Sequence, residues 1–347
     1  MTLYRVAVVG ATGAVGTTML DLLEKRGFPA SEIVPFASAR SAGRDLGNGR
    51  IVVGLADDTV TGFDVAIFSA GGAISREWAE RFAAGGAIVV DNSSAWRMYD
   101  DVPLVVSEVN PQALDDIGKG IVANPNCTTM AFMLPMKALH DAFGLKAIVA
   151  TSYQAAGGAG QKGIDELVEQ TPLLYERREQ LVDDGAAALE GIGHSIHEAP
   201  LAFNVVPMLG KDTGNGYTDE EMKMVFESRK ILGLPDLQVA PTCVRVGVVV
   251  GHCIEIRATF EREPELGAAL AALEAFPGVV LDEIPTPVKY AGRDEVAVGR
   301  VRADLSDPYS LNLFVVGDNL LKGAALNTVQ IAELLHERGL LRSGVAA

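Results

Sequence analysis

The chain has 347 residues and a formal net charge of −16. This length exceeds what one hydrophobic core usually serves, so we expect about two domains. So acidic a chain would be repelled by nucleic acid or by an anionic membrane surface, and we expect neither as a partner. A small anionic ligand is not excluded, because it responds to local charge.

The three cysteines are Cys127, Cys243 and Cys253. An odd count without CxxC spacing fits neither a disulfide scaffold nor a zinc ribbon. The N-terminus lacks the pattern of a secretory signal, and no apolar stretch approaches the roughly 20 residues that span a bilayer. We therefore predict a soluble, cytoplasmic protein.

The first elements have the pattern of a nucleotide-binding unit. Residues 4–9 (YRVAVV) are typical of a strand buried on both faces, and an amphipathic helix ended by Gly27 follows the turn GATGAVG. Glycines let the backbone approach a pyrophosphate, and a helix N-terminus offers N–H groups and a positive dipole end. The spacing is GxxGxxG rather than GxGxxG, and such glycines also occur in ordinary turns. The candidate cofactor-binding residues of this turn are Gly10, Thr12, Gly13, Ala14 and Val15.

The second strand, residues 33–38, is not followed by the acidic residue that binds the ribose of NAD. Hydroxyls and guanidiniums follow instead, from Ser38, Arg40 and Ser41, and they suit a 2′-phosphate. This favours NADP as the cofactor. The alternative is a basic surface loop.

Alternating elements continue along the chain. We predict strands at 64–70, 87–93, 104–110 and 120–126, with a helix at 73–86. Repeated β-α-β units predict a parallel, doubly wound sheet, which binds its ligands at the C-terminal ends of the strands. The stretch NPNCTT (124–129) lies at such an end.

Cys127 therefore stands where a strand passes into a helix. A lone cysteine among apolar residues is often only packing. At a helix N-terminus, however, the dipole and the free N–H groups lower the pKa of a thiol and can stabilise an oxyanion. A thiolate beside NADP suggests one chemistry, in which a thioester forms and is then reduced.

Several motifs occur together in this order: GATGAVG, SARS (38–41), DNSSAWR (91–97), NPNCTT, SYQA (152–155), an RxxxxxxH spacing at 245–252 and GDNLLKGAALN (317–327). From about residue 3 to 335 the chain resembles the bacterial aspartate-semialdehyde dehydrogenases. This family reduces L-4-aspartyl phosphate to L-aspartate-4-semialdehyde with NADPH and releases phosphate. The step leads to methionine, threonine and, through diaminopimelate, lysine.

The resemblance also implies the architecture, an α/β fold of two domains. A Rossmann-type NADP-binding domain covers residues 1–128 and is completed by a C-terminal helix within 319–347. An α+β catalytic and dimerisation domain with a mixed sheet covers 129–318, with helices on one face, and forms a homodimer. The pattern within it predicts a helix at 128–143, a strand and glycine turn at 146–160, a helix at 163–184, and strands at 201–207, 242–260 and 311–318.

The resemblance assigns roles to individual residues. Cys127 is the nucleophile, His252 the acid/base and Gln154 the group that orients the acyl substrate. Arg245 binds the substrate carboxylate and Glu220 its ammonium group. Lys223, Arg97 and Asn126 bind the phosphate, while Gly157 and Asn319 join the cofactor residues. The family usually has serine at the position of Gly157, so only backbone contact is expected there.

Three of these residues also have an interpretation from chemistry alone. A neutral imidazole at His252 could take the thiol proton and later protonate the hemithioacetal oxygen. Glu220 and Lys223 are three apart on a predicted helix that opens with the capping-box pattern of Thr218 and Glu221, so they could equally be a solvated pair. His194 and His197 have HxxH spacing without a third ligand, and we expect no metal.

Arg245 and His252 are separated by an odd number of positions. On one regular strand they would face opposite sides. If both serve one site, the strand must bulge or break between them, and Gly247 and Gly251 are the positions where we expect it.

Three other functions remain open from the sequence. N-acetyl-γ-glutamyl-phosphate reductase shares the chemistry, but its acetylated substrate gives no reason for an acidic partner such as Glu220. Glyceraldehyde-3-phosphate dehydrogenase usually takes NAD. A non-catalytic NADP-binding redox sensor would use Cys127 as its sensing thiol and would need no phosphate site.

Overall fold

The computed structural model describes residues 2–342. The chain divides into two compact units: unit 1 is Met1–Asn126, Arg229–Leu234 and Leu320–Ala347, and unit 2 is Cys127–Ser228 and Pro235–Asn319. Met1 and residues 343–347, which the sequence analysis places in the nucleotide-binding domain, lie outside the described residues. No helix within 2–342 is long and apolar enough to cross a membrane.

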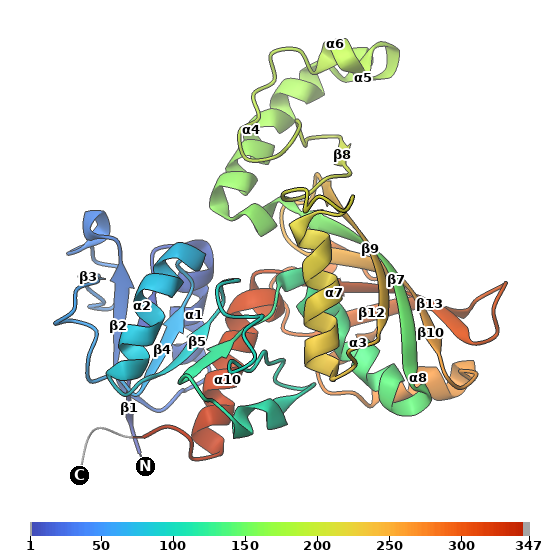
Figure 1. Cartoon of the computed structure of the whole chain (residues 1–347). Helices are drawn as coiled ribbons and strands as arrows, with labels where there is room; N and C mark the ends of the chain where they lie inside the picture. Colours follow the sequence, from blue (N-terminus) through green and yellow to red (C-terminus); the bar gives the residue numbers. More distant parts are fainter. Residues whose placement is uncertain (1, 343–347) are drawn as a thin grey trace. The chain divides into compact units, whose positions relative to one another are not determined.

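Unit 1 contains a parallel sheet of six strands in the order β3-β2-β1-β4-β5-β6 (Figure 1). The strand order therefore reverses between β1 and β4, which is the position where doubly wound sheets bind their ligands. The strands are β1 (Tyr4–Val9), β2 (Ala30–Ala37), β3 (Val53–Gly54), β4 (Val65–Phe68), β5 (Ile88–Asp91) and β6 (Ile121–Ala123). The helices are α1 (Ala14–Lys25), α2 (Gly72–Ala84) and α10 (Leu326–Glu337), with shorter turns η1 (Ala39–Ser41), η2 (Pro111–Asp115) and the π-helical η4 (Leu321–Ala325).

Helices cover both faces of this sheet. Ile67 of β4 packs in a cluster with α1 and α10 on one face, while the next residue, Phe68, packs edge-to-face on Phe82 of α2 on the other. Phe36 and Phe63 complete an aromatic group around Phe82. Both faces are apolar, which is why these strands are continuous runs of Val, Ile and Phe rather than alternating ones.

The prediction of a strand at 104–110 is wrong. Only Leu104 forms a bridge, to Ala123, and the chain then turns into η2. Asn110 closes the turn, because its side chain accepts from the Val106 N–H and donates to the Leu104 carbonyl. The side-chain amide thus makes the backbone hydrogen bonds that a neighbouring strand would otherwise make. Side-chain bonding of this kind competes with strand formation, and the hydrophobic pattern alone does not reveal it.

Unit 2 contains a mixed sheet of seven strands in the order β11-β12-β13-β10-β7-β9-β8. Its central strand pair β7–β10 is antiparallel, whereas β7 and β9 run parallel. The strands are β7 (Leu145–Ala155), β8 (Val205–Val206), β9 (Gln238–Val246), β10 (His252–Phe260), β11 (Val279–Leu281), β12 (Val296–Ala303) and β13 (Ser310–Gly317). The strand expected at 201–207 is reduced to the two residues of β8.

Unit 2 also contains seven helices. They are α3 (Cys127–Phe143), α4 (Gln161–Glu176), α5 (Arg178–Asp183), α6 (Gly185–Ala188), α7 (Asp219–Leu232), α8 (Leu266–Glu274) and α9 (Pro287–Tyr290), with the short turn η3 (Ala156–Ala159). The last residues of α7, from Arg229 onward, belong to unit 1. In β7, alternate residues such as Ile148 are buried toward α3, whereas Val149 and Tyr153 are exposed on the other face.

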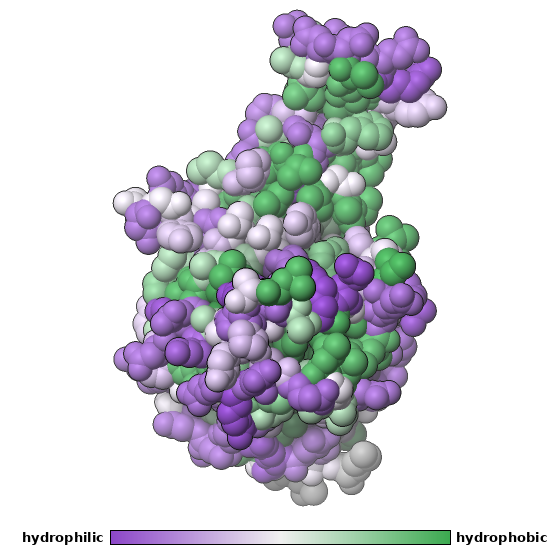
Figure 2. All heavy atoms as spheres, turned by 90° about the vertical axis from the view of Figure 1, so that its right-hand side faces the viewer, coloured by the Kyte–Doolittle hydropathy of each residue, from purple (hydrophilic) through white to green (hydrophobic). Residues whose placement is uncertain are grey.

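The helix predicted at 163–184 is two helices, because the helical backbone is interrupted at Arg177. Within unit 2, α4 to α6 project away from the mixed sheet (Figure 1). Apolar side chains lie on this projection, and Figure 2 shows green patches there. Leu173 and Val182 are among the exposed apolar residues of this segment.

Candidate active site

Cys127 is the first residue of α3, as the transition from strand to helix predicted. Its Sγ lies 3.3 Å from Nε2 of His252. The thiol thus lies at a helix N-terminus, where the dipole favours a thiolate, and beside an imidazole that can hydrogen-bond it.

The expected break between Arg245 and His252 is confirmed. β9 ends at Val246 and β10 begins at His252, and Gly251 has a φ of +98° in the connection. A side chain at Gly251 would also meet Pro287, at 2.8 Å. These two strands lie on either side of β7 in the sheet. The strand ends at one edge of the sheet therefore carry Arg245 on β9, Gln154 on β7 and His252 on β10. Gln154 is paired in register with Arg245.

Arg245 is mostly buried and holds the end of β7, since its Nη1 donates to the Ala155 carbonyl at 2.8 Å. Its Nε is buried without a hydrogen-bond partner within the described residues. Burial lowers the pKa of Arg245, although Cys127 and Glu220 oppose this. An arginine with a buried, unused N–H is suited to a carboxylate ligand, because the guanidinium donates in a fork.

His252 is fully buried. Burial, followed by the charge of Arg245, lowers its pKa to about 3, while Glu220 and the Gly251 backbone oppose the shift. The ring is therefore neutral at pH 7. Gln154 is also buried, and its side-chain amide donates to the Ser152 hydroxyl at 3.2 Å.

Helix α7 opens with the predicted capping box. The Thr218 N–H donates to Glu221 at 2.8 Å, and the Glu221 N–H donates to the Thr218 hydroxyl at 3.3 Å. Glu221 also accepts from the Cys243 N–H, which fixes the helix on β9. One residue earlier, Glu220 pairs with Lys223 at 2.6 Å. The contact is the one that a simple helix pair would make, but the pair is not solvated, because the side chains of Glu220 and Lys223 are only 14% and 28% exposed. The charge of Glu220 also acts on both Arg245 and His252.

Gly158 belongs to this site, although no sequence pattern singled it out. A Cβ at Gly158 would lie 2.6 Å from Arg245 Nη1 and 3.2 Å from His252 Nε2. In the sequence its only distinguishing feature was its position in a glycine-rich turn. That position does not show which side chains the glycine faces in the fold.

In unit 1, the loop before Cys127 is held from several sides. Arg97 donates through Nε to the Asn124 carbonyl and through Nη2 to the Asn92 carbonyl. The Asn124 amide donates to Asn92 and its side-chain oxygen accepts from Asn327 of α10. Arg97, predicted to bind phosphate, thus also supports the backbone that precedes the cysteine.

Two lysines of unit 1 were not predicted. Lys322 is buried in η4, where Nζ pairs with Glu108 at 2.5 Å and donates to Gln330 at 2.7 Å. Burial raises the pKa of Glu108, but Lys322 outweighs it, and the net shift is downward. Lys230 donates to the three carbonyls of Arg97, Tyr99 and Val102. Such contacts depend on tertiary structure and leave no local pattern.

The turn between β1 and α1 fits a dinucleotide. Gly10 has a φ of +88°, and a Cβ there or at Gly16 would overlap the main chain. Gly13 is the N-cap of α1 and makes no side-chain cap, and a helix N-terminus favours an anion. Ser38, Arg40 and Ser41 follow β2, and β2 pairs with β1 up to Val9–Phe36 beside this turn.

Gly157 and Asn319, the remaining candidate cofactor residues, lie in unit 2. Asn319 is buried, and its side-chain oxygen accepts from the Gly251 N–H at 2.8 Å. The Gly157 N–H donates to the Val249 carbonyl, and a Cβ at Gly157 would lie 2.9 Å from that oxygen. Both residues therefore hydrogen-bond to the connection between β9 and β10.

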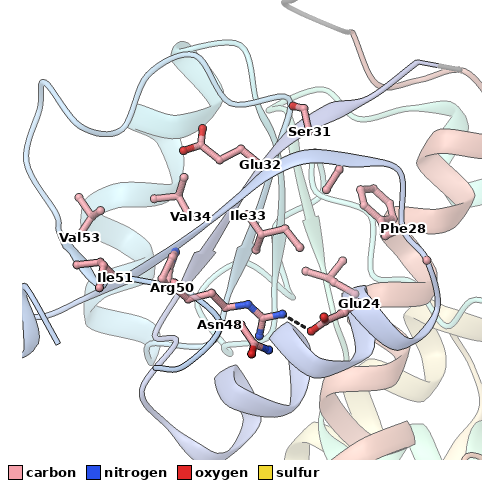
Figure 3. Close-up of a pocket in the computed structure, with 15 residues that line it drawn as sticks. Glu24, Phe28, Ser31, Glu32, Ile33, Val34, Asn48, Arg50, Ile51 and Val53 are labelled. Carbon is pink, nitrogen blue, oxygen red and sulfur yellow. Dashed lines mark hydrogen bonds and ion pairs between the residues drawn. The ribbon is translucent and has the colours of Figure 1, made fainter. Parts of the chain in front are cut away.

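A cavity of about 650 Å³ lies elsewhere in unit 1 (Figure 3). It is lined by β2, the end of α1 and residues 48–51, where Arg50 pairs with Glu24 at 2.5 Å. It contains none of the candidate cofactor residues, so its size does not identify it as the nucleotide site.

The two histidines of the HxxH spacing contact other groups of unit 2. Nδ1 of His197 pairs with the Glu166 carboxylate at 2.9 Å, and His194 contacts the His197 carbonyl. Among residues 2–342, no three potential ligands converge. Burial raises the pKa of Cys243 and of Cys253 to about 12, so these two thiols stay protonated and inert.

The fold and this edge of the sheet define a two-domain dehydrogenase. Residues 5–117 match the family model "Semialdehyde dehydrogenase, NAD binding domain", and residues 136–322 match "Semialdehyde dehydrogenase, dimerisation domain". The chain is thus an NAD(P)-dependent oxidoreductase of the semialdehyde dehydrogenase class.

Comparison with similar proteins identifies the family within this class. The chain is 51% identical to aspartate-semialdehyde dehydrogenase of Streptomyces akiyoshiensis over 95% of this chain and 98% of the relative. It is 45% identical to the enzyme of Aquifex aeolicus over 97% and 99% of the two chains. The crystal structure of aspartate semialdehyde dehydrogenase II from Vibrio cholerae complexed with ASA has a TM-score of 0.90 at 40% identity, covering 97% of this chain and 99% of that one. The chain belongs to the aspartate-semialdehyde dehydrogenase family, whose work lies in amino-acid biosynthesis, and the relatives do not favour the alternatives left open by the sequence.

Proposed function

We propose that the chain converts L-4-aspartyl phosphate to L-aspartate-4-semialdehyde with NADPH, through a thioester on Cys127. The observation that carries this proposal is the pairing of Cys127 Sγ with His252 Nε2 at 3.3 Å at the N-terminus of α3. A thiolate there attacks the acyl carbon, forms the C–S bond and expels phosphate with the electron pair of the broken C–O bond.

Substrate recognition follows from charge. Arg245 takes the α-carboxylate and Glu220 the ammonium group, while Gln154 orients the acyl group. Lys223, Arg97 and Asn126 bind the phosphate, and their cations stabilise the leaving anion. These local positive charges explain how a chain of net charge −16 binds an anionic substrate.

Unit 1 serves as the nucleotide domain and unit 2 as the catalytic domain. The turn Gly10–Val15 takes the pyrophosphate, Ser38, Arg40 and Ser41 take the 2′-phosphate, and Gly157 and Asn319 line the nicotinamide side. NADPH, when bound, supplies the hydride that reduces the acyl carbon held on Cys127.

The partner in solution is a second copy of the chain, and the enzyme works in the cytoplasm. Support for the dimer comes from the match to a dimerisation domain and from the apolar side chains on the uncovered face of the mixed sheet. Val149 is 48% exposed there, and the rings of Tyr153 and Phe314 lie tilted to each other with their centroids 6.3 Å apart.

The test supplies aspartate semialdehyde, phosphate and NADP to the purified protein and follows the reduced nicotinamide. Phosphate-dependent reduction that Cys127→Ala abolishes, with NADPH binding retained, supports the proposal. Reduction only with N-acetylglutamate semialdehyde would move the substrate to that class. No reduction with either aldehyde would overturn the enzymatic role and favour a redox sensor.

A further inference from the structure

Asn92 and Asn124 follow two neighbouring strands of the sheet in unit 1. Asn92 is the first residue after β5, Asn124 is the first residue after β6, and these strands pair in parallel. The two side chains therefore meet at the C-terminal edge of the sheet, where sheets of this type bind their ligands. Nδ2 of Asn124 donates to Oδ1 of Asn92 at 2.7 Å.

Asn327 of α10 is fixed in one amide orientation. Its Oδ1 accepts from the Ser107 main-chain N–H at 3.0 Å and from the Lys322 ammonium at 3.2 Å, and both of these groups can only donate. Its Nδ2 donates to the Val105 carbonyl at 2.9 Å, which can only accept. Reversing this fully buried amide would oppose like groups at all three contacts and leave them unsatisfied.

The orientation of Asn327 determines that of two further amides. Nδ2 of Asn327 also donates to Oδ1 of Asn124 at 2.6 Å, so the other end of Asn124 is its NH2 group. That group donates to Oδ1 of Asn92 and, at 3.4 Å, to the Pro125 carbonyl. In this amide relay, Asn327–Asn124–Asn92, the last oxygen is used as an acceptor. The NH2 group of Asn92 is left to donate, and it has no acceptor within residues 2–342.

The relay ends next to Arg97. Nη2 of Arg97 donates to the main-chain carbonyl of Asn92 at 3.0 Å, and its Nε donates to that of Asn124 at 2.9 Å. The guanidinium therefore lies against the backbone of both asparagines. Asn92 is partly exposed, whereas Asn124 and Asn327 are fully buried. An N–H donor close to a cation suits an anionic ligand, while an amide oxygen in its place would repel one.

We propose that Asn92 donates its NH2 group to the phosphate of the substrate, and that Asn327 is a positioning residue that acts on this phosphate through the relay. The inference rests on the proposed function, in which Arg97 and Asn126 bind the same phosphate. Asn126 lies two residues after Asn124, so the relay also holds the loop that carries it. Neither relay end makes or breaks a bond. The donor of Asn92 stabilises the charge that grows on the phosphate as the acyl–phosphate bond breaks.

Asn92→Asp tests the donor. Aspartate keeps an oxygen that accepts from Asn124 but replaces the NH2 group with a second oxygen, which repels phosphate. Titration calorimetry of the full-length protein with inorganic phosphate measures binding without turnover. We expect the phosphate Kd to rise by about 10- to 100-fold, as loss of a hydrogen bond to a charged group does, and the NADPH Kd to change by less than about 2-fold. Asn48→Asp, with the same charge change at an exposed position of unit 1, is the control.

The two titrations distinguish the two sources of phosphate. An unchanged phosphate Kd in Asn92→Asp would overturn the proposal. A rise in the NADPH Kd alone would overturn it as well, because the donor would then serve a phosphate of the cofactor.

Asn327→Asp tests the relay. Aspartate still accepts from Ser107 and Lys322 but cannot donate to Asn124. The Asn124 amide then reverses, and the oxygen of Asn92 turns toward the phosphate. We expect the phosphate Kd to rise by about 10-fold in the wild-type background but by less than about 2-fold in the Asn92→Ala background, because coupled residues are not additive.

The double-mutant cycle separates positioning from a structural role. An equal rise of the phosphate Kd in both backgrounds would overturn the positioning role of Asn327, since the added charge or a general loss of stability would act without Asn92. Thermal unfolding identifies a variant that does not fold, and in that case Asn92→Asp and Asn92→Ala carry the test.

The dehydrogenase assay distinguishes failure of this inference from failure of the proposed function. At saturating phosphate, kcat of Asn92→Ala should stay within about 3-fold of the wild type, while the KM for phosphate rises with the Kd. The expected Kd values without any dehydrogenase activity would mean that the proposed function is wrong. Normal activity with unchanged Kd and KM values would overturn the role of Asn92.

Discussion

Arg245 and His252, on opposite sides of β7, leave no room for a side chain at Gly158. A Cβ there would lie 2.6 Å from Arg245 Nη1 and 3.1 Å from Cε1 of His252. A residue larger than glycine at position 158 would therefore fill the space between these two side chains. We propose that the acyl and carboxylate ends of the substrate occupy this region.

Gly158→Ala tests the importance of this space. The methyl group displaces the guanidinium or the imidazole, and we expect kcat/KM to fall by about 10- to 100-fold, since displacements of about 1 Å have such effects on catalysis. Steady-state kinetics with aspartate semialdehyde measure the change. Gly193→Ala is the matched control, because an added Cβ there meets no atom within 4 Å. Unchanged kinetics in Gly158→Ala would show that the site tolerates the methyl group.

Gly157→Ser restores the residue that the family usually has, and we expect it to harm this chain. The new Cβ would lie 2.9 Å from the Val249 carbonyl, so the turn after β7 or the connection after β9 must shift. Overpacking of this kind costs about 1–3 kcal/mol of stability. Thermal unfolding and NADPH titration measure the outcome, with Gly185→Ser as a control at a position with open space. Tighter NADPH binding at unchanged stability would contradict the expectation.

The sequence predicted local features well and long-range contacts poorly. The capping box of Thr218 and Glu221 and the break at Gly251 were predictable, because each depends on residues near in the chain. The turn at 104–110 was not, since it depends on an asparagine side chain replacing a strand partner.

The candidate site shows the same limit. The chemistry of Cys127 followed from a strand–helix boundary, and its pairing with His252 followed from a family resemblance. The carbonyls bound by Lys230 and the space at Gly158 come from segments distant in sequence. No periodicity or spacing encodes which distant segments meet, so these residues become visible only in the fold.

Arg40→Ala should change the choice of cofactor. The guanidinium follows β2 in η1 and is proposed to bind the 2′-phosphate of NADPH, which NADH lacks. A charge-assisted hydrogen bond of about 1.5–3 kcal/mol corresponds to a loss of roughly 10- to 100-fold in NADPH affinity. NADH affinity should stay nearly constant. Fluorescence titrations of both cofactors measure the ratio, with Arg5→Ala, at the start of β1, as the control. A parallel loss for both cofactors would place Arg40 elsewhere than at the 2′-phosphate.

Glu166 should make the α4–α6 projection sensitive to acid. Burial raises the pKa of this carboxyl, but the N–H groups of Ser195, Ile196 and His197 outweigh it and lower the pKa to about 2. A carboxyl whose pKa is lower in the folded state stabilises the fold above its unfolded pKa. That stability, on the order of 3 kcal/mol, is then lost as the pH falls from about 4.5 toward 2.

Glu166→Gln should therefore lower the free energy of unfolding at pH 7, and its difference from the wild type should shrink as the pH falls below about 4.5. Denaturant unfolding at several pH values, together with hydrogen exchange of residues 161–197, measures this difference. Glu169→Gln, exposed on the same helix, is the control and should follow the wild type at every pH. A difference between wild type and Glu166→Gln that stays constant from pH 7 to 3 would mean that the carboxylate charge does not hold the segment at 195–197, and that packing alone anchors the projection.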